Sequence, residues 1–404
     1  MSRRFGAHNK IAIVGYAHST ALRRAIEPLG SVALRTAAAA IKDSGLTVDQ
    51  IDGFASSAML PTSGAHQSVD GLSSVSSNWL AQHLAASPSY VVGFQGHGQL
   101  TSSLTLAVNA LASGAADYML LHRALHNPAV GKYNDNPMKL ARGAQQWTAP
   151  QGFFGALPAI AMVYNEYCQR YGATREAMAR VVVEARNNGA KLPWSHWYGK
   201  PITAQEYMAE PIIVDPMCRL DCDIPVQAVG VFILTTAERA KDLPNKPVYV
   251  SGYANGYPEQ HRLALHWTLD EMQESGQALA KRLWVSAGMG PEAIQLAQVY
   301  DAFSPFVYIW LEALGFCPIG EAHRFVLDGG IDSSQPGSIA ALSGGGAIGS
   351  GRLHGLPQLL ECYLQLSGRA GERQRAVTNA VFSYSAPYFG GAAILTNDPA
   401  GAVR

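Results

Sequence analysis

The sequence has few charged residues and no excess of either sign. Of its 404 residues, 30 are Lys or Arg and 30 are Asp or Glu, so the formal net charge is zero and charged residues make up only 15%. A neutral chain offers no electrostatic attraction to nucleic acid or to an anionic membrane surface. Hydrophobic residues reach 48%, and 40 residues are glycine. This composition argues against disorder and favours a close-packed α/β enzyme.

The chain also lacks a metal-binding cysteine pattern and a long apolar run. Its five cysteines are scattered, and only Cys218 and Cys222 stand close, as a CxxxC without the two further ligands of a zinc site. Unpaired cysteines suit a reducing compartment, so we expect a cytoplasmic protein without a bound metal. No uncharged apolar run reaches about 20 residues, which predicts no membrane span. The start, MSRRFGAHNK, runs straight into IAIVG and does not read as a signal peptide.

One pattern of elements occurs twice along the chain. Residues 10–18 read KIAIVGYAH, and residues 246–255 read KPVYVSGYAN. Both place Lys before an apolar strand that ends near Gly-Tyr-Ala. An Ala-rich helical pattern follows each strand, at Ser31–Ser44 and at Gln277–Ala287. Internal similarity of this kind predicts a duplicated fold.

The repetition continues further along both halves. Helical patterns at 102–114 and 352–368 each contain a terminal Ser-Gly and precede an apolar strand, which is typical of βαβ units. We therefore predict two similar halves, 1–245 and 246–404, packed on each other. The alternative is that two unrelated α/β segments share commonplace features.

Residues 122–215 have no counterpart in the second half. They are rich in aromatics and predict two helices, over Ala159–Arg170 and over Thr174–Asn188, each with apolar residues at helical spacing. We interpret this segment as a cap inserted in the first half. Such a cap covers a substrate tunnel or builds a subunit contact, and the sequence does not choose between these roles.

Several stretches, taken in their order and spacing, point to one known family. They are IAIVGYAHS, DQIDGFASSA, YGATREAMARVVVEARNNGA (171–190), ITAQEYMAEPIIVDPMCRLDC (202–222), YDAFSPFVYIWLEALGFCPIGEA (300–322), ALSGGGA (341–347) and SYSAPYFGGAAIL (383–395). Together they resemble the thiolase superfamily, and within it the sterol-carrier-protein thiolase-like branch. The resemblance implies a thiolase-like, duplicated five-layer αβαβα fold with an inserted cap, and a homodimer.

The residues that thiolases use for acyl transfer are replaced in this chain. A thiolase needs a nucleophilic Cys activated by a His, and a second Cys or His for proton transfer. By the resemblance, the nucleophile's place falls at about His97, and the family's Gly-His-Pro becomes Gly344, Gly345 and Gly346. The third position falls near Ser385. We therefore expect no covalent acyl-enzyme.

The retro-aldolases of steroid side-chain degradation belong to the same branch and also carry Tyr-Asp at the catalytic strand, as in Tyr300-Asp301. They cleave a β-hydroxyacyl-CoA into a ketone or aldehyde and a shorter acyl-CoA. This reaction needs a proton carrier at the hydroxyl and donors to the thioester oxygen as an enolate forms. A phenol with a pKa near 10 is a better acid than base, so we expect Tyr300 to carry the proton. Backbone N–H groups at 97–100 would bind the enolate oxygen.

The retro-aldolases also carry a second Tyr in the Gly-rich loop, where this chain has Gly344. We expect Tyr384, His97 or His354 to take its place. The catalytic candidates are therefore Tyr300, His97, Asp301, Tyr384 and Ser385, and the substrate-binding candidates are Ser343, Gly344, Gly345, Gly346 and His354. Each also has a structural interpretation, such as a helix cap for Asp301 and turn packing for Tyr384 and Ser385.

The resemblance also bears on partners and cofactors. CoA is expected only as part of the substrate, and a separate partner chain with an OB-fold and a zinc ribbon is implied. Two other functions stay open. One is a catalytically silent thiolase-like protein that binds acyl-CoA or serves as a scaffold. The other is an acyltransferase in which His97 or Cys317 acts as the nucleophile.

Overall fold

The computed structural model describes residues 3–57, 70–93, 99–126, 146–153, 155–256, 268–387 and 389–400. Its main feature is one mixed sheet of nine strands, in the order β3-β2-β4-β7-β1-β8-β11-β10-β9. In the first half, β2 runs parallel to β3 and β4, whereas β4, β7 and β1 are antiparallel neighbours. These strands are β1 (Ile11–His18), β2 (Gly53–Ser56), β3 (Tyr90–Gly93), β4 (Tyr118–His126) and β7 (Gln227–Thr236).

The second half repeats the arrangement of the first. Its strand β9 runs parallel to β10, whereas β10, β11 and β8 are antiparallel neighbours, so β9-β10-β11-β8 has the same pairing pattern as β2-β4-β7-β1. The halves join edge to edge where β1 pairs with β8. These strands are β8 (Val248–Asn255), β9 (Leu296–Gln298), β10 (Asn379–Tyr384) and β11 (Gly391–Thr396). The border at 245/246 falls between β7 and β8.

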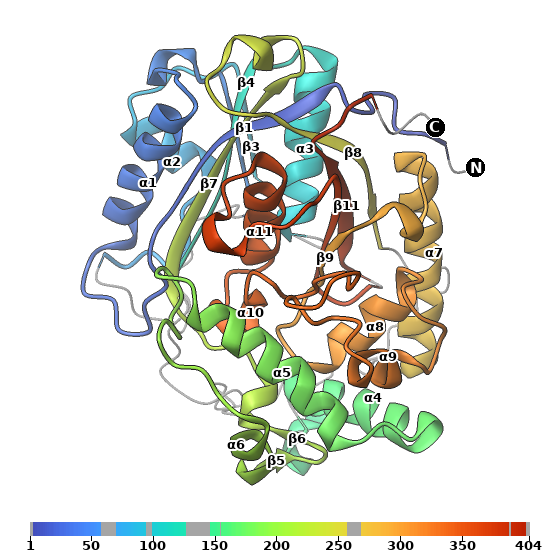
Figure 1. The fold of residues 1–404 in the computed structure, drawn as a ribbon. Coiled ribbons are helices and arrows are strands. Elements are labelled where there is room, and N and C mark those ends of the chain that lie inside the picture. Colours follow the sequence, from blue (N-terminus) through green and yellow to red (C-terminus); the bar gives the residue numbers. More distant parts are fainter. Residues whose placement is uncertain are drawn as a thin grey trace.

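Helices cover both faces of each half in a five-layer arrangement, as Figure 1 shows. One apolar core lies between the outer helices of the first half and its sheet, a second around the two central helices, and a third on the outer helices of the second half. The outer helices of the first half are α1 (Leu29–Asp43) and α2 (Ser77–His83), the central ones are α3 (Gln99–Ser113) and α11 (Leu356–Ser367), and those of the second half are α7 (Leu269–Ala287), α8 (Pro305–Ala313) and α9 (Ala322–Leu327). The predicted five-layer arrangement is confirmed (Figure 1).

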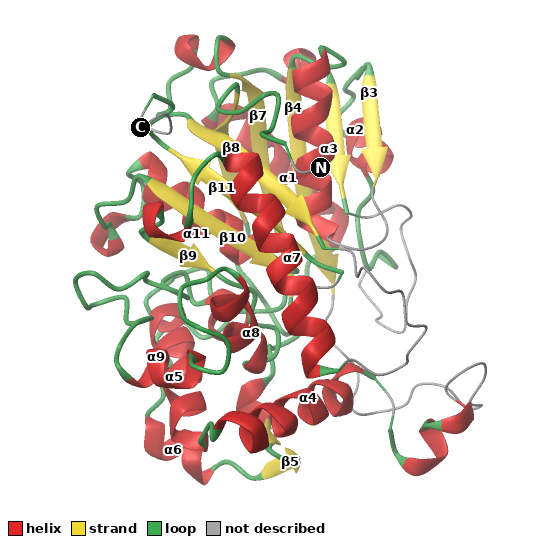
Figure 2. Ribbon diagram, turned by 90° about the vertical axis from the view of Figure 1, so that its right-hand side faces the viewer, coloured by secondary structure: helices red, strands yellow, loops and turns green. Residues whose placement is uncertain are grey.

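The inserted segment forms the lower end of the molecule in Figure 2. Both predicted helices are present, as α4 (Ala156–Tyr171) and α5 (Arg175–Ala190). The Thr174 side chain caps α5 by accepting a hydrogen bond from the backbone of Ala177 (3.4 Å). The segment also contains α6 (Ala204–Ala209) and a ribbon of β5 (Ile212–Val214) and β6 (Met217–Cys218), and α10 (Gly346–Ser350) lies against α5.

Two details of this segment differ from the prediction. Strand β4 continues to His126, beyond the predicted start of the insertion at 122, because residues 123–126 stay buried and continue to pair with β7. The helices α4 and α5 pack against α7, α9 and α10 of the second half, although they are inserted in the first. The cap therefore covers the end of the second half.

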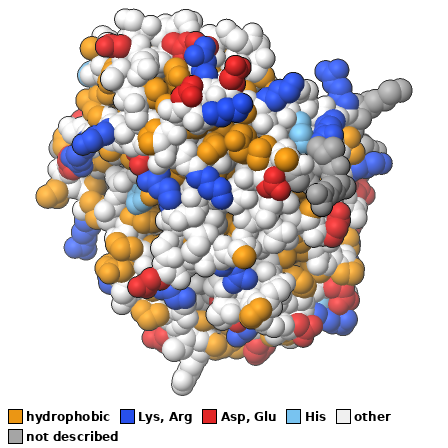
Figure 3. Space-filling view, turned by 45° about the horizontal axis from the view of Figure 1, so that its top comes forward, with side chains coloured by type: hydrophobic (Ala, Val, Ile, Leu, Met, Phe, Trp, Pro, Cys, Tyr) orange, Lys and Arg blue, Asp and Glu red, His pale blue; other side chains and the backbone are white. Residues whose placement is uncertain are grey.

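The described surface carries both charges in mixture. On the face in Figure 3, Lys and Arg side chains alternate with Asp and Glu. Within the described ranges, no helix is long and apolar enough to cross a bilayer.

Candidate active site

Two tyrosines meet at the ends of neighbouring parallel strands. Tyr300 follows the end of β9, and Tyr384 is the last residue of β10, so both lie at the carboxyl edge where α/β sheets form their sites. Their ring centres are 4.8 Å apart, and each residue is 5% exposed. The backbone N–H of Tyr300 donates to Ser383 Oγ (3.0 Å), which ties the two strand ends together.

The two phenols lie side by side and affect each other's pKa, and both stay protonated at neutral pH. Burial raises the pKa of Tyr300. Burial also raises the pKa of Tyr384, although the charge of Arg123 and the hydrogen bond with Tyr300 lower it in part. The pair can therefore pass a proton between its oxygens without either phenol being ionised beforehand.

A buried guanidinium and a neutral imidazole stand next to this pair. Arg123 of β4 is 5% exposed and donates to the carbonyl of Ser57 (3.1 Å), to its Oγ (2.8 Å) and to His354 Nδ1 (2.6 Å). Because Arg has no acceptor, Nδ1 of His354 must accept and its Nε2 must carry the proton. Burial and the charge of Arg123 hold the pKa of His354 well below its usual value.

The backbone at His354 indicates that this arrangement is imposed by the fold. His354 has φ +52°, a left-handed conformation that costs energy for a residue with a Cβ. Ser385, directly after Tyr384, has φ +64°, and its carbonyl accepts from Trp310 Nε1 (2.7 Å). The imidazole centre of His354 lies 6.1 Å from the ring centre of Tyr384. Strained residues therefore flank the tyrosines on two sides.

An ion pair that the sequence analysis did not single out completes the cluster. Arg352 Nε lies 3.0 Å from Asp223 Oδ1, and Asp223 is 2% exposed. The backbone N–H of Asp223 donates to the carbonyl of Ala302 (2.9 Å), which places the carboxylate alongside the segment that carries Tyr300. Burial raises the pKa of Asp223 to about 6, against the effect of Arg352. Its charge in turn raises the pKa of both tyrosines.

Asp301 is engaged elsewhere. Its carboxylate accepts from the backbone of Ala347 (2.6 Å) and Ile348 (3.0 Å) and from Gln358 Nε2 (2.8 Å). Burial raises the pKa of Asp301 to about 7, and the two backbone hydrogen bonds lower it in part. The structural interpretation expected a cap on the helix over Phe303–Ala313, whereas the carboxylate accepts hydrogen bonds from the first turn of α10. Its catalytic role stays a prediction.

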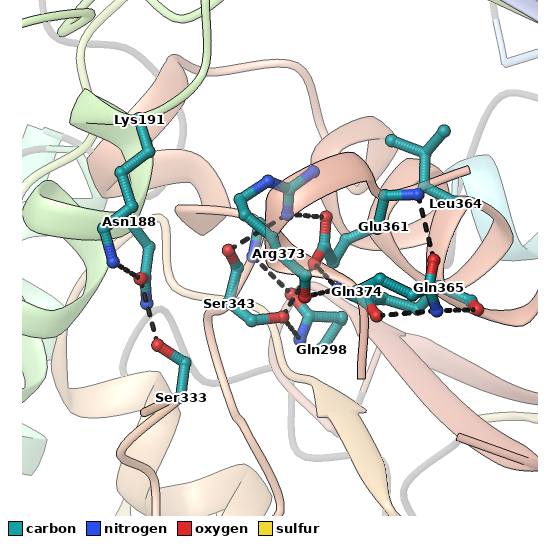
Figure 4. A network of polar contacts seen from close by, with 12 residues as sticks. Asn188, Lys191, Gln298, Ser333, Ser343, Glu361, Leu364, Gln365, Arg373 and Gln374 are labelled. Atoms are coloured by element: carbon teal, nitrogen blue, oxygen red, sulfur yellow. Dashed lines mark hydrogen bonds and ion pairs between the residues drawn. The ribbon is translucent and has the colours of Figure 1, made fainter. Parts of the chain in front are cut away.

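The Gly-rich loop is held in a polar network, shown in Figure 4. Ser343 Oγ donates to Glu361 (2.9 Å) and accepts from Gln298 Nε2 (3.2 Å), and Glu361 pairs with Arg373. The backbone N–H of Gly344 donates to Gln298 Oε1 (3.3 Å). The other two predicted binding residues are packed tightly: a Cβ on Gly345 would lie 2.8 Å from Gly189, and one on Gly346 would lie 2.2 Å from Asp301 Oδ2. These contacts support the loop's shape, and its role in substrate binding stays a prediction.

His97 lies outside the described residues. Helix α3 begins two residues later, and its Thr101 stands next to Gly391, where a Cβ would lie 2.3 Å from Thr101 Oγ1. Gly391 is the strand partner of Tyr384, so the start of α3 lies beside the tyrosine pair. The role of the backbone at 97–100 as a donor to the enolate oxygen stays a prediction. The described residues contain no cluster of three or more metal-ligating side chains.

Comparison with known proteins agrees with this architecture. The family "Thiolase C-terminal domain-like" matches residues 259–393. The 17-hydroxy-3-oxo-4-pregnene-20-carboxyl-CoA lyase of Mycobacterium tuberculosis is 31% identical over 282 residues, covering 68% of this chain and 72% of the lyase. This chain belongs to the thiolase superfamily. The steroid side-chain-cleaving aldolase of Thermomonospora curvata, a similar relative, is 29% identical over 299 residues, or 72% of this chain and 75% of the aldolase.

Solved structures of thiolase-like proteins superpose on the whole chain. The structure "Ltp2-ChsH2(DUF35) aldolase" has a TM-score of 0.82 at 26% identity, covering 96% of this chain and 98% of the other. A monomeric SCP2-thiolase like protein of Mycobacterium smegmatis has a TM-score of 0.69 at 18% identity, over 98% of this chain and 79% of that one, and shares the fold. The expected branch of the superfamily is confirmed.

Proposed function

We propose that this chain is a retro-aldolase that splits a bulky β-hydroxyacyl-CoA into a ketone or aldehyde and a shorter acyl-CoA. The observation that carries the proposal is the buried, adjacent pair of Tyr300 and Tyr384 beside the guanidinium groups of Arg123 and Arg352. The similar lyase is named for a pregnene carboxyl-CoA and the similar aldolase for steroid side-chain cleavage, which favours a steroid or similar ring system as the substrate body.

The reaction moves one proton and breaks one carbon–carbon bond. The β-hydroxyl gives its proton to the Tyr300 oxygen, and the electrons of the O–H bond form the new carbonyl. The bond between the α and β carbons breaks, and its electrons form an enolate of the thioester. As Tyr300 accepts this proton, it passes its own phenol proton to the Tyr384 oxygen, and Tyr384 gives its own proton to the enolate carbon in the same step, so that neither oxygen carries two protons. No net proton is consumed, so two neutral phenols are sufficient.

Charged neighbours have separate roles in this scheme. The negative charge of Asp223 raises the affinity of the phenol oxygens for a proton, which favours proton uptake from the substrate. The Nε2–H of His354 and the backbone at the start of α3 supply donors for the enolate oxygen. All three are fixed before substrate binds, so little reorganisation is required.

An acyltransferase with a displaced thiol is less well supported. All five cysteines lie in the described ranges, and burial raises the pKa of each thiol, to about 12 for Cys317. A thiol is a nucleophile only as thiolate, so none of them is activated. The silent-scaffold alternative leaves the strained backbone and buried charges around Tyr384 without a purpose.

The proposal is tested by incubating the purified chain with a β-hydroxyacyl-CoA whose β carbon bears a steroid ring. We expect a free ketone and the shorter acyl-CoA by liquid chromatography, and no mass added to the intact protein. An adduct of acyl mass would instead support the acyltransferase. If no product forms with any ring system that is tested, whether the chain is alone or mixed with a partner protein, the result would support the scaffold alternative.

We further propose a separate partner chain and a homodimer. The name of the similar solved complex joins an aldolase chain to a DUF35 chain, which supports an OB-fold and zinc-ribbon partner. Light scattering of the chain alone and mixed with an OB-fold protein encoded nearby tests both. A monomer that forms no complex and is fully active alone would contradict these two proposals.

A further inference from the structure

Arg186 of α5 is a buried cation that has no acidic hydrogen-bond partner among the described residues. It is 5% exposed, its Nε is buried without a hydrogen-bond partner, and its Nη2 donates only to the carbonyl of Lys200 at 3.4 Å. The acidic group that acts on it, Glu206, is engaged with the backbone and hydroxyl of Thr203 (2.7 and 2.9 Å). A buried guanidinium without a counter-ion is costly. Burial accordingly lowers the pKa of Arg186 to about 10.

The surroundings of Arg186 are positive. Its guanidinium lies 3.6 Å from the ring centre of Trp197, which fixes its plane. The next side chain, His196, is half-buried. Burial lowers the pKa of this imidazole, and the charges of Lys200, Arg23 and Arg186 lower it further. Lys200 is exposed and Arg23 half-buried, so the group opens to solvent on one side. We call the three cations Arg23, Arg186 and Lys200 the cationic cluster; the neutral imidazole of His196 lies among them.

The cationic cluster lies on the outer side of the loop that carries the active-site residues. The backbone N–H of His196 donates to the carbonyl of Ser350 (3.1 Å), two residues before Arg352. Arg23 Nη1 donates to the carbonyl of Pro225 (3.2 Å), and Pro225 bridges to Arg352. The cluster is therefore connected through one layer of backbone to the ion pair beside Tyr300.

We propose that the cationic cluster binds a phosphate group of the CoA part of the substrate. This rests on the proposed function, because CoA carries a diphosphate and a 3′-phosphate far from its thioester. Several cationic side chains close together match the multiple negative charges of a phosphate better than they match the single charge of a carboxylate. The phosphate would supply the counter-ion that Arg186 lacks among the described residues.

The test measures binding of CoA without turnover, by calorimetry, to the wild type and to two variants. Arg186→Met keeps the length of the side chain and removes its charge. Arg180→Met removes a cation of the same helix that lies outside the cluster and is the matched control. We expect Arg186→Met to bind CoA about 10- to 100-fold more weakly, the loss typical of a charged hydrogen bond. Arg180→Met should bind within about twofold of the wild type.

Truncated ligands identify the group that is bound. Pantetheine, which has no phosphate, should bind equally to the wild type and Arg186→Met, whereas dephospho-CoA shows whether the 3′-phosphate is the one held. An equal loss for CoA and pantetheine, or no loss for CoA, would overturn the inference while leaving the proposed function intact. Protection from thermal unfolding by inorganic phosphate but not by CoA would overturn it in favour of free phosphate. A wild type that does not bind CoA would contradict both proposals.

Folding of the variant is checked separately. Since Arg186 has no counter-ion, removing its charge should not lower the unfolding temperature. If Arg186→Met is nevertheless unstable, the binding of CoA and of pantetheine is compared between the wild type and Lys200→Met, whose substitution lies at an exposed position. It should weaken CoA binding and leave pantetheine binding unchanged.

Discussion

Replacing Asp223 with Asn should abolish the fall in kcat/KM that we expect for the wild type between pH 7 and pH 5. The Asp223 carboxyl has a pKa raised to about 6, whereas an ordinary Asp has a pKa near 4, so it loses its charge as the pH falls through 6. About nine tenths of it is ionised at pH 7 and about one tenth at pH 5, so the wild-type kcat/KM should fall about tenfold over this window. The titratable groups around it are Arg352, Asp301 and the two tyrosines, of which only Asp301 has a pKa near this range.

The assay is a pH profile of kcat/KM for ketone release between pH 5 and 8. Asp223→Asn should be about 100-fold slower at pH 7 and nearly flat from pH 5 to 7, since proton uptake no longer depends on this charge. Asp301→Asn is the control, because Asp301 has its pKa raised to about 7 but is directed at α10. The Asp301→Asn variant should still lose kcat/KM as the pH falls from 7 to 5. A fall that persists in Asp223→Asn and disappears in Asp301→Asn would refute the reasoning.

Three further outcomes follow from the contacts described. Glu361→Gln breaks a buried ion pair with Arg373 and should cost about 3–5 kcal/mol of unfolding free energy in urea melts, and a cost below about 1 kcal/mol would show that the pair is replaceable. Gly346→Ala should lower both the melting temperature and turnover because its Cβ meets Asp301, whereas Gly371→Ala, with a similar φ but open space around it, should show only the small cost of strain; equal effects would contradict the packing argument. Cys317→Ser should keep turnover within about twofold since its thiol is not activated, and abolished product release would point to the displaced nucleophile.

The sequence predicted those parts of the molecule that depend on local pattern. Apolar periodicity and terminal glycines indicated α4, α5 and the repeated strands, because burial of one helix face is visible in a single segment. Tyr300, Tyr384 and His354 were singled out, and the structure brings these three together. Their grouping depends on β9 and β10 being parallel neighbours, which the duplicated order implied.

The charged residues of the site could not be predicted in the same way. Arg123 stands in an apolar strand with no motif around it, and its partner His354 is 231 positions away. Asp223 and Arg352 are separated by 129 positions. A single charge in an apolar run does not reveal its counter-ion, because the pairing is set by tertiary packing. The Asp221-Cys222-Asp223 stretch between apolar residues was the available signal, since a buried acid there requires a partner.

The central claim is that the hydroxyls of Tyr300 and Tyr384 carry the proton, and it is tested most directly by removing one oxygen atom. Ketone release from the β-hydroxyacyl-CoA is compared for Tyr300→Phe and Tyr308→Phe. The Tyr308 hydroxyl is equally buried but has no hydrogen-bond partner among the described residues. We predict a loss of kcat of about 100-fold or more for Tyr300→Phe and no change for Tyr308→Phe. If Tyr300→Phe releases ketone at the wild-type rate, the account is contradicted.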